Sequence, residues 1–294
     1  GELINGSFLE DFATSHEGLT TGDLDKFVLK FWETEFNATW KPYIQHAGST
    51  HPYSGRTDAI RWGDDGEIVR NSPTSYVKGK EAWGQTGIRI TQMRSLPATF
   101  YTGEIFGKSA ATILPRDPDH LMAVWCFCSS AEYRQLVRAI DQKVNVTIGT
   151  LVKVPFDLPK WQSLANVLYP EGIPHPFSAH PTQWLFGGTP KGANHPLHVA
   201  VARLLGYKWP RQNGTSFPGC PTLDPDGLDA LGDEDGIVCL APVRGEASAV
   251  ERLRKLIATA FGEDWTTAKE RELLLATAVD NNAKKADPDL DAWL

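Results

Sequence analysis

The sequence predicts a mixed α+β fold, with short strands and packed helices first and a mainly helical region after them. Between residues 40 and 116, short β-prone runs alternate with turn residues. After residue 195, apolar residues recur at helical spacing. The length of 294 residues suits about two domains. With 41% hydrophobic and 22% charged residues, the composition excludes disordered, collagen-like and coiled-coil classes.

The first elements are predicted from spacing and turn residues. Residues 20–33 are expected to form a helix that begins after Asp23. Its apolar face would consist of Leu24, Phe27, Val28 and Phe31. A hairpin follows, because 59–62 and 67–70 flank a Gly-Asp-Asp-Gly turn. Further strands are predicted at 87–91, 110–115, 144–147, 151–155 and 236–240.

Helices dominate the remainder of the prediction. They are expected at 118–128, 131–143, 158–168, 197–205, 248–261 and 266–279. Ser130 is placed to cap the second of them. The elements divide the chain into an N-terminal connecting segment, a mixed domain, a loop rich in Pro, Gly and His, and a helical C-terminal subdomain. Their bounds are 1–29, 30–168, 169–194 and 195–294.

Charge is unevenly distributed along this acidic chain, whose formal net charge is -7. Residues 30–160 carry 16 Lys and Arg against 13 Asp and Glu, whereas the segments on either side are net acidic. A basic surface in an otherwise acidic protein indicates a polyanionic partner. Solvated faces of either sign are common, so charge alone is a weak indication.

No motif predicts a catalytic or metal site. Residues 187–192 match the glycines of a phosphate-binding loop, but Ala193 and Asn194 stand where Lys and Ser or Thr are needed. An EF-hand loop beginning at Asp224 would need glycine at Asp229. His195 and His198 have no further ligand at metal-site spacing. There is no Gly-x-Ser-x-Gly elbow. We therefore predict no catalytic residue and no metal in this chain.

The cysteines and the hydropathy of the sequence indicate the cellular location, and the chain ends indicate whether the sequence is part of a longer protein. Cys126 and Cys128 are two residues apart in an apolar run, which predicts buried free thiols and a reducing, cytoplasmic setting. No apolar run approaches the ~20 residues that a membrane helix needs. The chain starts at Gly1 without an initiator Met and ends in an amphipathic phrase, so we expect a piece of a longer protein.

Two stretches, 113–130 and 140–157, carry a resemblance to a known family. They resemble the closing half of the target recognition domain in large adenine-N6 DNA methyltransferases of the type IIG, BREX and DISARM kinds. In that family a strand, a helix ending in Ser-Ser and a second helix precede a motif that starts with Asn, continues through Gly and two aliphatic residues, and ends with Pro. This motif is matched here by Asn145, Gly149, Leu151, Val154 and Pro155. The stretches 31–33, 40–43, 60–62 and 87–91 resemble the opening of the domain, and 181–186 and 238–246 are most similar to DISARM-type enzymes.

The resemblance implies a type I/IIG-like target recognition domain at 30–168 that binds double-stranded DNA. The family's catalytic Asn-Pro-Pro-Tyr motif is missing, and the nearest string is 71–74. The glycine-rich loop for S-adenosylmethionine is also missing, so that cofactor is expected only in an absent catalytic domain. Side chains able to reach bases and phosphates are Arg56, Arg61, Lys78, Lys80, Arg89, Gln92 and Arg94.

A second hypothesis is a protein-interaction module that docks the methyltransferase to other defence-system proteins. The acidic flanks and the helical tail would suit that use. A small hydrolase is disfavoured because no nucleophile elbow and no metal set is found.

Overall fold

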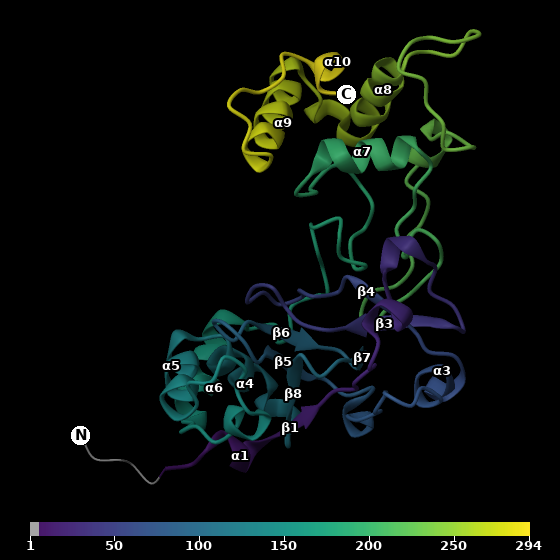
Figure 1. Ribbon diagram of the computed structural model, residues 1–294. Helices are drawn as coiled ribbons and strands as arrows, with labels where there is room; N and C mark the ends of the chain where they lie inside the picture. Colours follow the sequence, from purple (N-terminus) through teal and green to yellow (C-terminus); the bar gives the residue numbers. More distant parts are fainter. Residues whose placement is uncertain (1–5) are drawn as a thin grey trace. The chain divides into compact units, whose positions relative to one another are not determined.

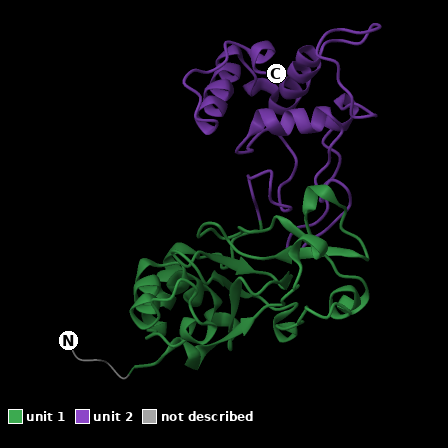
Figure 2. Ribbon diagram, in the orientation of Figure 1, with its two compact units in different colours: residues 1–176 green, residues 177–294 purple. Residues whose placement is uncertain are grey.

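The computed structural model describes residues 6–294 and divides the chain into two compact units. Unit 1 comprises residues 1–176 and unit 2 residues 177–294 (Figure 2). The fold is mixed α+β, with two four-stranded sheets in unit 1 and a helical unit 2. The mixed class and the helical C-terminal part are therefore confirmed.

The first sheet of unit 1 is antiparallel, in the order β1-β8-β5-β6. Its strands are β1 (Ala13–Glu17), β8 (Ala110–Pro115), β5 (Gly87–Thr91) and β6 (Ala98–Tyr101). β1 lies in the segment that was expected to be a connector. Ala13 pairs with Pro115, which makes this segment an edge strand of the sheet.

The second sheet has the order β2-β4-β3-β7. Its strands are β2 (Val28–Lys30), β4 (Asp58–Arg61), β3 (Trp40–Ile44) and β7 (Ile105–Phe106). β3 and β7 run parallel, whereas the other pairs are antiparallel. A helix over 20–33 was the wrong prediction. The α-helix is limited to α2 (Leu24–Phe27), capped by Asp23, because Val28 then pairs with Ile60 of β4; a 3-10 turn follows at Phe31–Glu33.

Three helices gather beside the first sheet (Figure 1). They are α4 (Leu121–Cys128), α5 (Ala131–Ile140) and α6 (Leu158–Leu168). α4 packs against β5 and β8, and the ring of Trp125 stacks on Phe100 of β6 at 4.3 Å. Ser130 caps α5 as predicted, since its hydroxyl accepts a hydrogen bond from the backbone of Tyr133 at 3.0 Å.

Some predicted strands of unit 1 are absent from the described structure. Residues 67–70 form α3 (Glu67–Arg70), because the chain turns at Gly66, where the indole of Trp62 leaves no room for a side chain. Residues 144–147 are irregular, and 148–151 form a 3-10 turn. The Asp141 carboxylate accepts the backbone N–H groups of Lys143 and Thr147, so these donors are not available to a strand. A short α1 (Leu9–Phe12) precedes β1.

Unit 2 contains four helices around one core. They are α7 (Pro196–Leu204), α8 (Ala249–Phe261), α9 (Thr267–Asp280) and α10 (Leu290–Trp293). The face of α8 predicted to be buried is buried: Leu253, Leu256, Ile257 and Phe261. The strand predicted at 236–240 does not form. Unit 2, all of which is described, offers it no partner strand, and Ile237 and Leu240 are exposed.

Candidate nucleic-acid interface

Three of the seven side chains predicted to contact DNA lie inside unit 1. Arg56, Arg89 and Gln92 are 0%, 1% and 4% exposed. In this conformation they cannot reach a duplex, so that part of the predicted interface needs correction. Arg89 illustrates the cause, because the alternating pattern of 87–91 predicts one apolar face and one polar face. Every residue of β5 is nevertheless buried, because the polar face is also covered.

Each of these three side chains donates hydrogen bonds within the protein. Arg56 forms an ion pair with Glu104 at 3.0 Å and donates to the carbonyl oxygen of Phe100. The Nε2 atom of Gln92 donates to the carbonyl oxygen of Val146 at 2.7 Å. These interactions join segments far apart in sequence, which is a structural role.

The other four predicted side chains are exposed but not equally available. Lys78 pairs with Glu17 at 2.6 Å, and Lys80 lies 4.0 Å from Asp65. The side chain of Arg61, at the end of β4, forms no ion pair or hydrogen bond with the residues that the structure describes. Arg94 likewise has no ion pair among residues 6–294. Arg61 and Arg94 are therefore the predicted cations with the most accessible charge.

Arg94 lies in a tight turn between β5 and β6, and its backbone is left-handed with φ of 56°. Leu96, two residues later, has φ of 53°. Residues other than glycine rarely adopt this backbone conformation, and each one that does lowers the stability of the fold by about 1–2 kcal/mol. The turn is closed by hydrogen bonds from Thr91 N to Pro97 O at 2.9 Å and from Leu96 N to Met93 O at 3.1 Å. Strained backbone of this kind is concentrated at binding sites, which makes this turn the leading candidate for the DNA contact.

Two further cations lie beside this turn and were missed by the sequence analysis. Arg138 of α5 donates to the backbone oxygen of Arg94 at 2.9 Å and also to that of Lys143. Lys143 is exposed and forms no ion pair among the described residues. We call the surface formed by Met93, Arg94, Arg138, Lys143 and Val144 the β5–β6 patch. Met93 and Val144 are 39% and 80% exposed.

One carboxylate lies close to the patch, but its role is structural. Hydrogen bonds from the backbones of Thr147 and Lys143 hold the pKa of Asp141 below its usual range. Both of its oxygens therefore organise the loop that follows α5. Three cations and one carboxylate leave the neighbourhood net positive. Arg138 and Lys143 could have been identified only from their position next to the basic turn. That position depends on how α5 packs.

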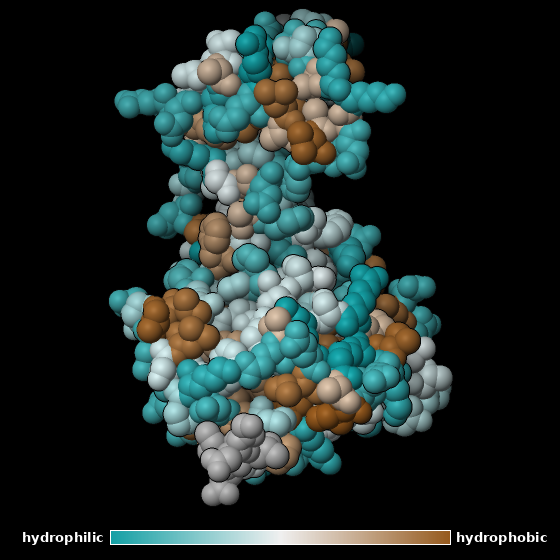
Figure 3. Space-filling view, turned by 90° about the vertical axis from the view of Figure 1, so that its left-hand side faces the viewer, coloured by the Kyte–Doolittle hydropathy of each residue, from teal (hydrophilic) through white to brown (hydrophobic). Residues whose placement is uncertain are grey.

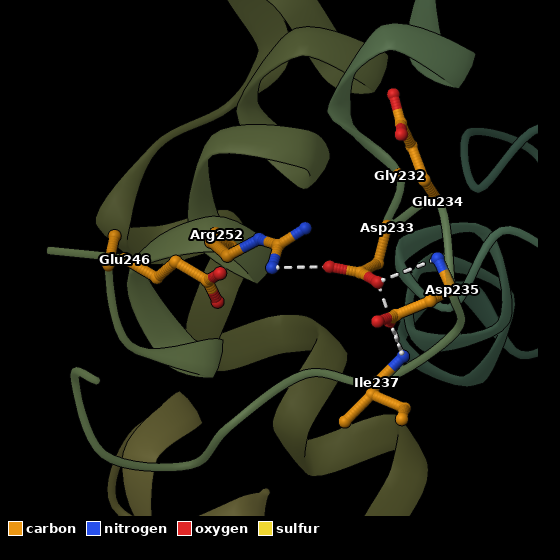
Figure 4. A pocket seen from close by; sticks show the side chains of 8 residues that line it. Gly232, Asp233, Glu234, Asp235, Ile237, Glu246 and Arg252 are labelled. Atoms are coloured by element: carbon orange, nitrogen blue, oxygen red, sulfur yellow. Dashed lines mark hydrogen bonds and ion pairs between the residues drawn. The ribbon is translucent and has the colours of Figure 1, made fainter. Parts of the chain in front are cut away.

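Unit 2 carries a pocket of opposite character. It has a volume of about 510 Å³, and its charged lining residues are Asp233, Glu234, Asp235, Glu246 and Arg252 (Figure 4). Arg252 of α8 forms an ion pair with Asp233 at 2.8 Å. Hydrogen bonding with Asp235, and then with Arg252, holds the pKa of Asp233 far below its usual range. With four carboxylates and one guanidinium, this pocket repels DNA.

Other chemistry is limited within residues 6–294. No group of three or more His, Cys, Asp or Glu side chains in this part of the chain could hold a metal ion. None of its helices is both long and apolar enough to cross a membrane. The thiols of Cys126 and Cys128 are buried, as predicted.

A scan against protein-family models found no match to this chain, and a search of curated protein sequences found none either.

Proposed function

We propose that unit 1 is the target recognition module of an adenine-N6 DNA methyltransferase from a bacterial restriction-modification or phage-defence system. Unit 2 would be its helical extension, and the catalytic domain would lie outside this chain. The resemblance of 113–130 and 140–157 to that family supports the class of enzyme. The observation that carries DNA binding is the β5–β6 patch, where Arg94 in a strained turn and Lys143 beside that turn are exposed cations without ion-pair partners.

The patch has the chemistry that a duplex requires. Arg94 and Lys143 can neutralise phosphates, which releases counterions and drives association. An arginine can also donate two hydrogen bonds to a guanine edge. Arg61, at the end of β4, offers a third cation elsewhere on unit 1. On the face drawn in Figure 3, apolar side chains of unit 1 form separate small patches with polar surface between them. That face is thus unlike the broad apolar surface of an obligate protein partner.

The test is the binding of labelled duplex DNA, measured by fluorescence anisotropy at several salt concentrations. Charge reversal of Arg94 and Lys143 to Glu should weaken binding to every sequence. It should also reduce the slope of log K against log salt by roughly two, because two phosphate contacts are lost. Arg89 is unsuitable for this test, because reversing a buried charge would unfold the protein.

The matched control reverses Lys284 and Lys285, which are exposed and lie in unit 2. Both pairs of substitutions change the net charge equally, so a difference between them isolates location from bulk repulsion. Equal losses of DNA affinity from both pairs, or binding that does not depend on salt concentration, would contradict the proposal.

That outcome would favour the second candidate, a module that docks to other defence-system proteins. The acidic pocket supports it, since Glu234 and Glu246 line it together with the exposed side chain of Ile237. A basic partner with an apolar anchor would suit this surface. Charge reversal of Glu234 and Glu246 should then abolish the interaction with such a partner.

A further inference from the structure

A second cavity, separate from the β5–β6 patch, lies in unit 1 beside the second sheet. Its volume is about 310 Å³, at the lower end of the range for small-molecule sites, about 300–1,000 Å³. Three segments line it: the end of β3, the loop after β7, and the chain between β1 and α2. Its lining residues are Leu19, Thr20, Thr21, Gly22, Leu24, Tyr43, Gln45, Gly107, Lys108 and Ser109. None of them is acidic.

The walls are fixed by hydrogen bonds between the three segments. The backbone N–H of Lys108 donates to the oxygen of Leu19 at 3.0 Å, and that of Gly107 donates to Ile44 at 3.0 Å. The hydroxyl of Ser109 donates to the oxygen of Gln45 at 2.8 Å. The cavity is therefore formed before any ligand arrives.

The hydroxyl of Tyr43 is a hydrogen-bond donor available at this cavity. Tyr43 is only 2% exposed, yet within residues 6–294 its hydroxyl has no hydrogen-bond partner. It lies over Gly107, where an added Cβ would come within 2.2 Å of the oxygen. Burial raises the pKa of Tyr43 well above its ordinary value, so the group remains a neutral donor. Unlike the Nε atom of Arg89, this hydroxyl is not sealed from solvent, so it can donate to an acceptor that enters the cavity.

Positive charge surrounds this donor. Behind the wall, the buried guanidinium of Arg89 donates to the oxygens of Gln45 and Gly107, and its Nε atom has no partner among the described residues. Its pKa is lowered by burial to about 10, so it is charged at neutral pH. On the open side, Lys108 is exposed and forms no ion pair within the described chain.

The nearby carboxylates are already engaged with other cations. Glu104 pairs with Arg56 at 3.0 Å, and Asp58 pairs with Lys30 at 2.6 Å. Arg89 and Lys108 thus leave two positive charges without a carboxylate partner. Asp23 and Asp25 precede and follow Leu24 in the chain, but neither lines the cavity. Inside unit 1, Glu104 is shared by the guanidinium groups of Arg56 and Arg89, so the side of the cavity at Arg89 and Lys108 keeps net positive charge, which favours an anionic ligand.

We propose that this cavity binds a phosphate group, held by the ammonium of Lys108 and the hydroxyl of Tyr43 in the field of Arg89. A phosphate offers three or more acceptor oxygens and up to two negative charges, which match the donors and the charge present. The group could belong to a free phosphomonoester or to a DNA backbone. The inference stands independently of the β5–β6 patch, since the two surfaces share no residue.

The experiment is calorimetric titration of the full chain with inorganic phosphate, adenosine 5′-monophosphate and acetate, all at constant ionic strength. The wild-type protein should bind both phosphates, and acetate more weakly. Lys108→Gln and Tyr43→Phe should each weaken phosphate binding about tenfold, the effect of one hydrogen bond to a charged group. Tyr43→Phe removes a hydroxyl that has no internal partner, so thermal unfolding should confirm an unchanged fold.

Lys153→Gln is the matched control, because Lys153 is an exposed lysine of unit 1 that does not line the cavity. Equal losses of phosphate affinity in Lys153→Gln and Lys108→Gln would overturn the proposal. So would a heat of titration with phosphate no larger than the heat of titration with sodium chloride. Duplex binding separates the two sources. If Tyr43→Phe also weakens DNA binding, the phosphate belongs to a backbone; if only the mononucleotide is lost, it belongs to a phosphomonoester.

Discussion

The guanidinium of Arg56 and the carboxylate of Glu104 form an ion pair at 3.0 Å inside unit 1, where their side chains are 1% and 7% exposed. Glu104 also accepts hydrogen bonds from the backbone and the hydroxyl of Thr102. The pair therefore connects the segment before β4 to the loop after β6. Because Arg89 is buried nearby, this single carboxylate offsets a core that contains two guanidinium groups.

Replacing Glu104 with Gln should strongly destabilise unit 1. The substitution leaves Arg56 charged and buried without its partner, a change that typically costs about 3–5 kcal/mol. Urea unfolding followed by tryptophan fluorescence would measure it. Glu17→Gln is the comparison, because its pair with Lys78 is exposed and should contribute less than about 1 kcal/mol. Similar losses from the two substitutions would show that burial does not govern the pair.

Replacing Arg94 with Gly should separate DNA binding from stability. Glycine adopts a positive φ without strain, so the free energy of unfolding should stay unchanged or rise by up to about 1 kcal/mol. DNA binding should weaken at the same time, because the cation is removed. Ser95→Gly, at the next position and without a positive φ, should instead lower stability by about 0.5–1 kcal/mol. A destabilised Arg94→Gly variant would mean that the Arg94 side chain stabilises the turn.

Acidification should destabilise unit 2 as its histidines become protonated. Burial, and then the neighbouring His195, lowers the pKa of His180 and His198. The folded state therefore binds fewer protons than the unfolded state, and stability falls as the pH drops through the ordinary histidine value of about 6.5. Asp280, which pairs with His195 at 3.0 Å, opposes this effect at His198.

The measurement for the histidines is thermal unfolding between about pH 7.5 and pH 5.5, above the range in which most carboxylates titrate. A variant with His180→Asn and His198→Asn should lose much of the pH dependence. His175→Asn is the control, because the histidine it replaces is exposed in unit 1. A double variant as sensitive to pH as the wild type would assign the effect to other groups.

The thiols should differ in their reactivity toward a disulfide reagent. Cys239 is partly exposed, whereas Cys126, Cys128 and Cys220 are buried. Burial raises the pKa of Cys126 to about 11 and that of Cys128 further, so little thiolate forms at mildly alkaline pH. Cys239 should therefore react first in the native protein, and Cys239→Ser should remove the fast phase. A fast phase that persists in this variant would show that a buried thiol becomes accessible.

The helices were easier to predict than the pairing of the strands. The spacing of Leu253, Leu256, Ile257 and Phe261 identified the buried face of α8, because a helix is determined by contacts local in sequence. The alternation in 87–91 identified β5 correctly. It could not reveal that the face carrying Arg89 is covered, since that depends on chain segments distant in sequence.

The positive charge of the candidate site could be predicted from the sequence, but only some of its residues could. Arg94 was identified from residue type and neighbourhood, and it lies at the strained turn. Arg138 and Lys143 become neighbours of that turn only through the packing of α5 and the loop after it. The periodicity of 20–33 also misled, because pairing with β4 outweighed local helix preference at Val28.

The pairing of β1 with β8 has a consequence for how the chain folds during synthesis. Ala13 leaves the ribosome long before its partner Pro115, so the strand at the sheet's edge must wait for a distant segment before it can dock. Until then β8 and β5 can pair, but the outer side of β8 has unpaired backbone groups that can join the strands of other molecules. A chain that begins after Glu17 would keep this edge open permanently. Such a truncation would be expected to aggregate, even though it removes none of the cations placed at the proposed DNA surface.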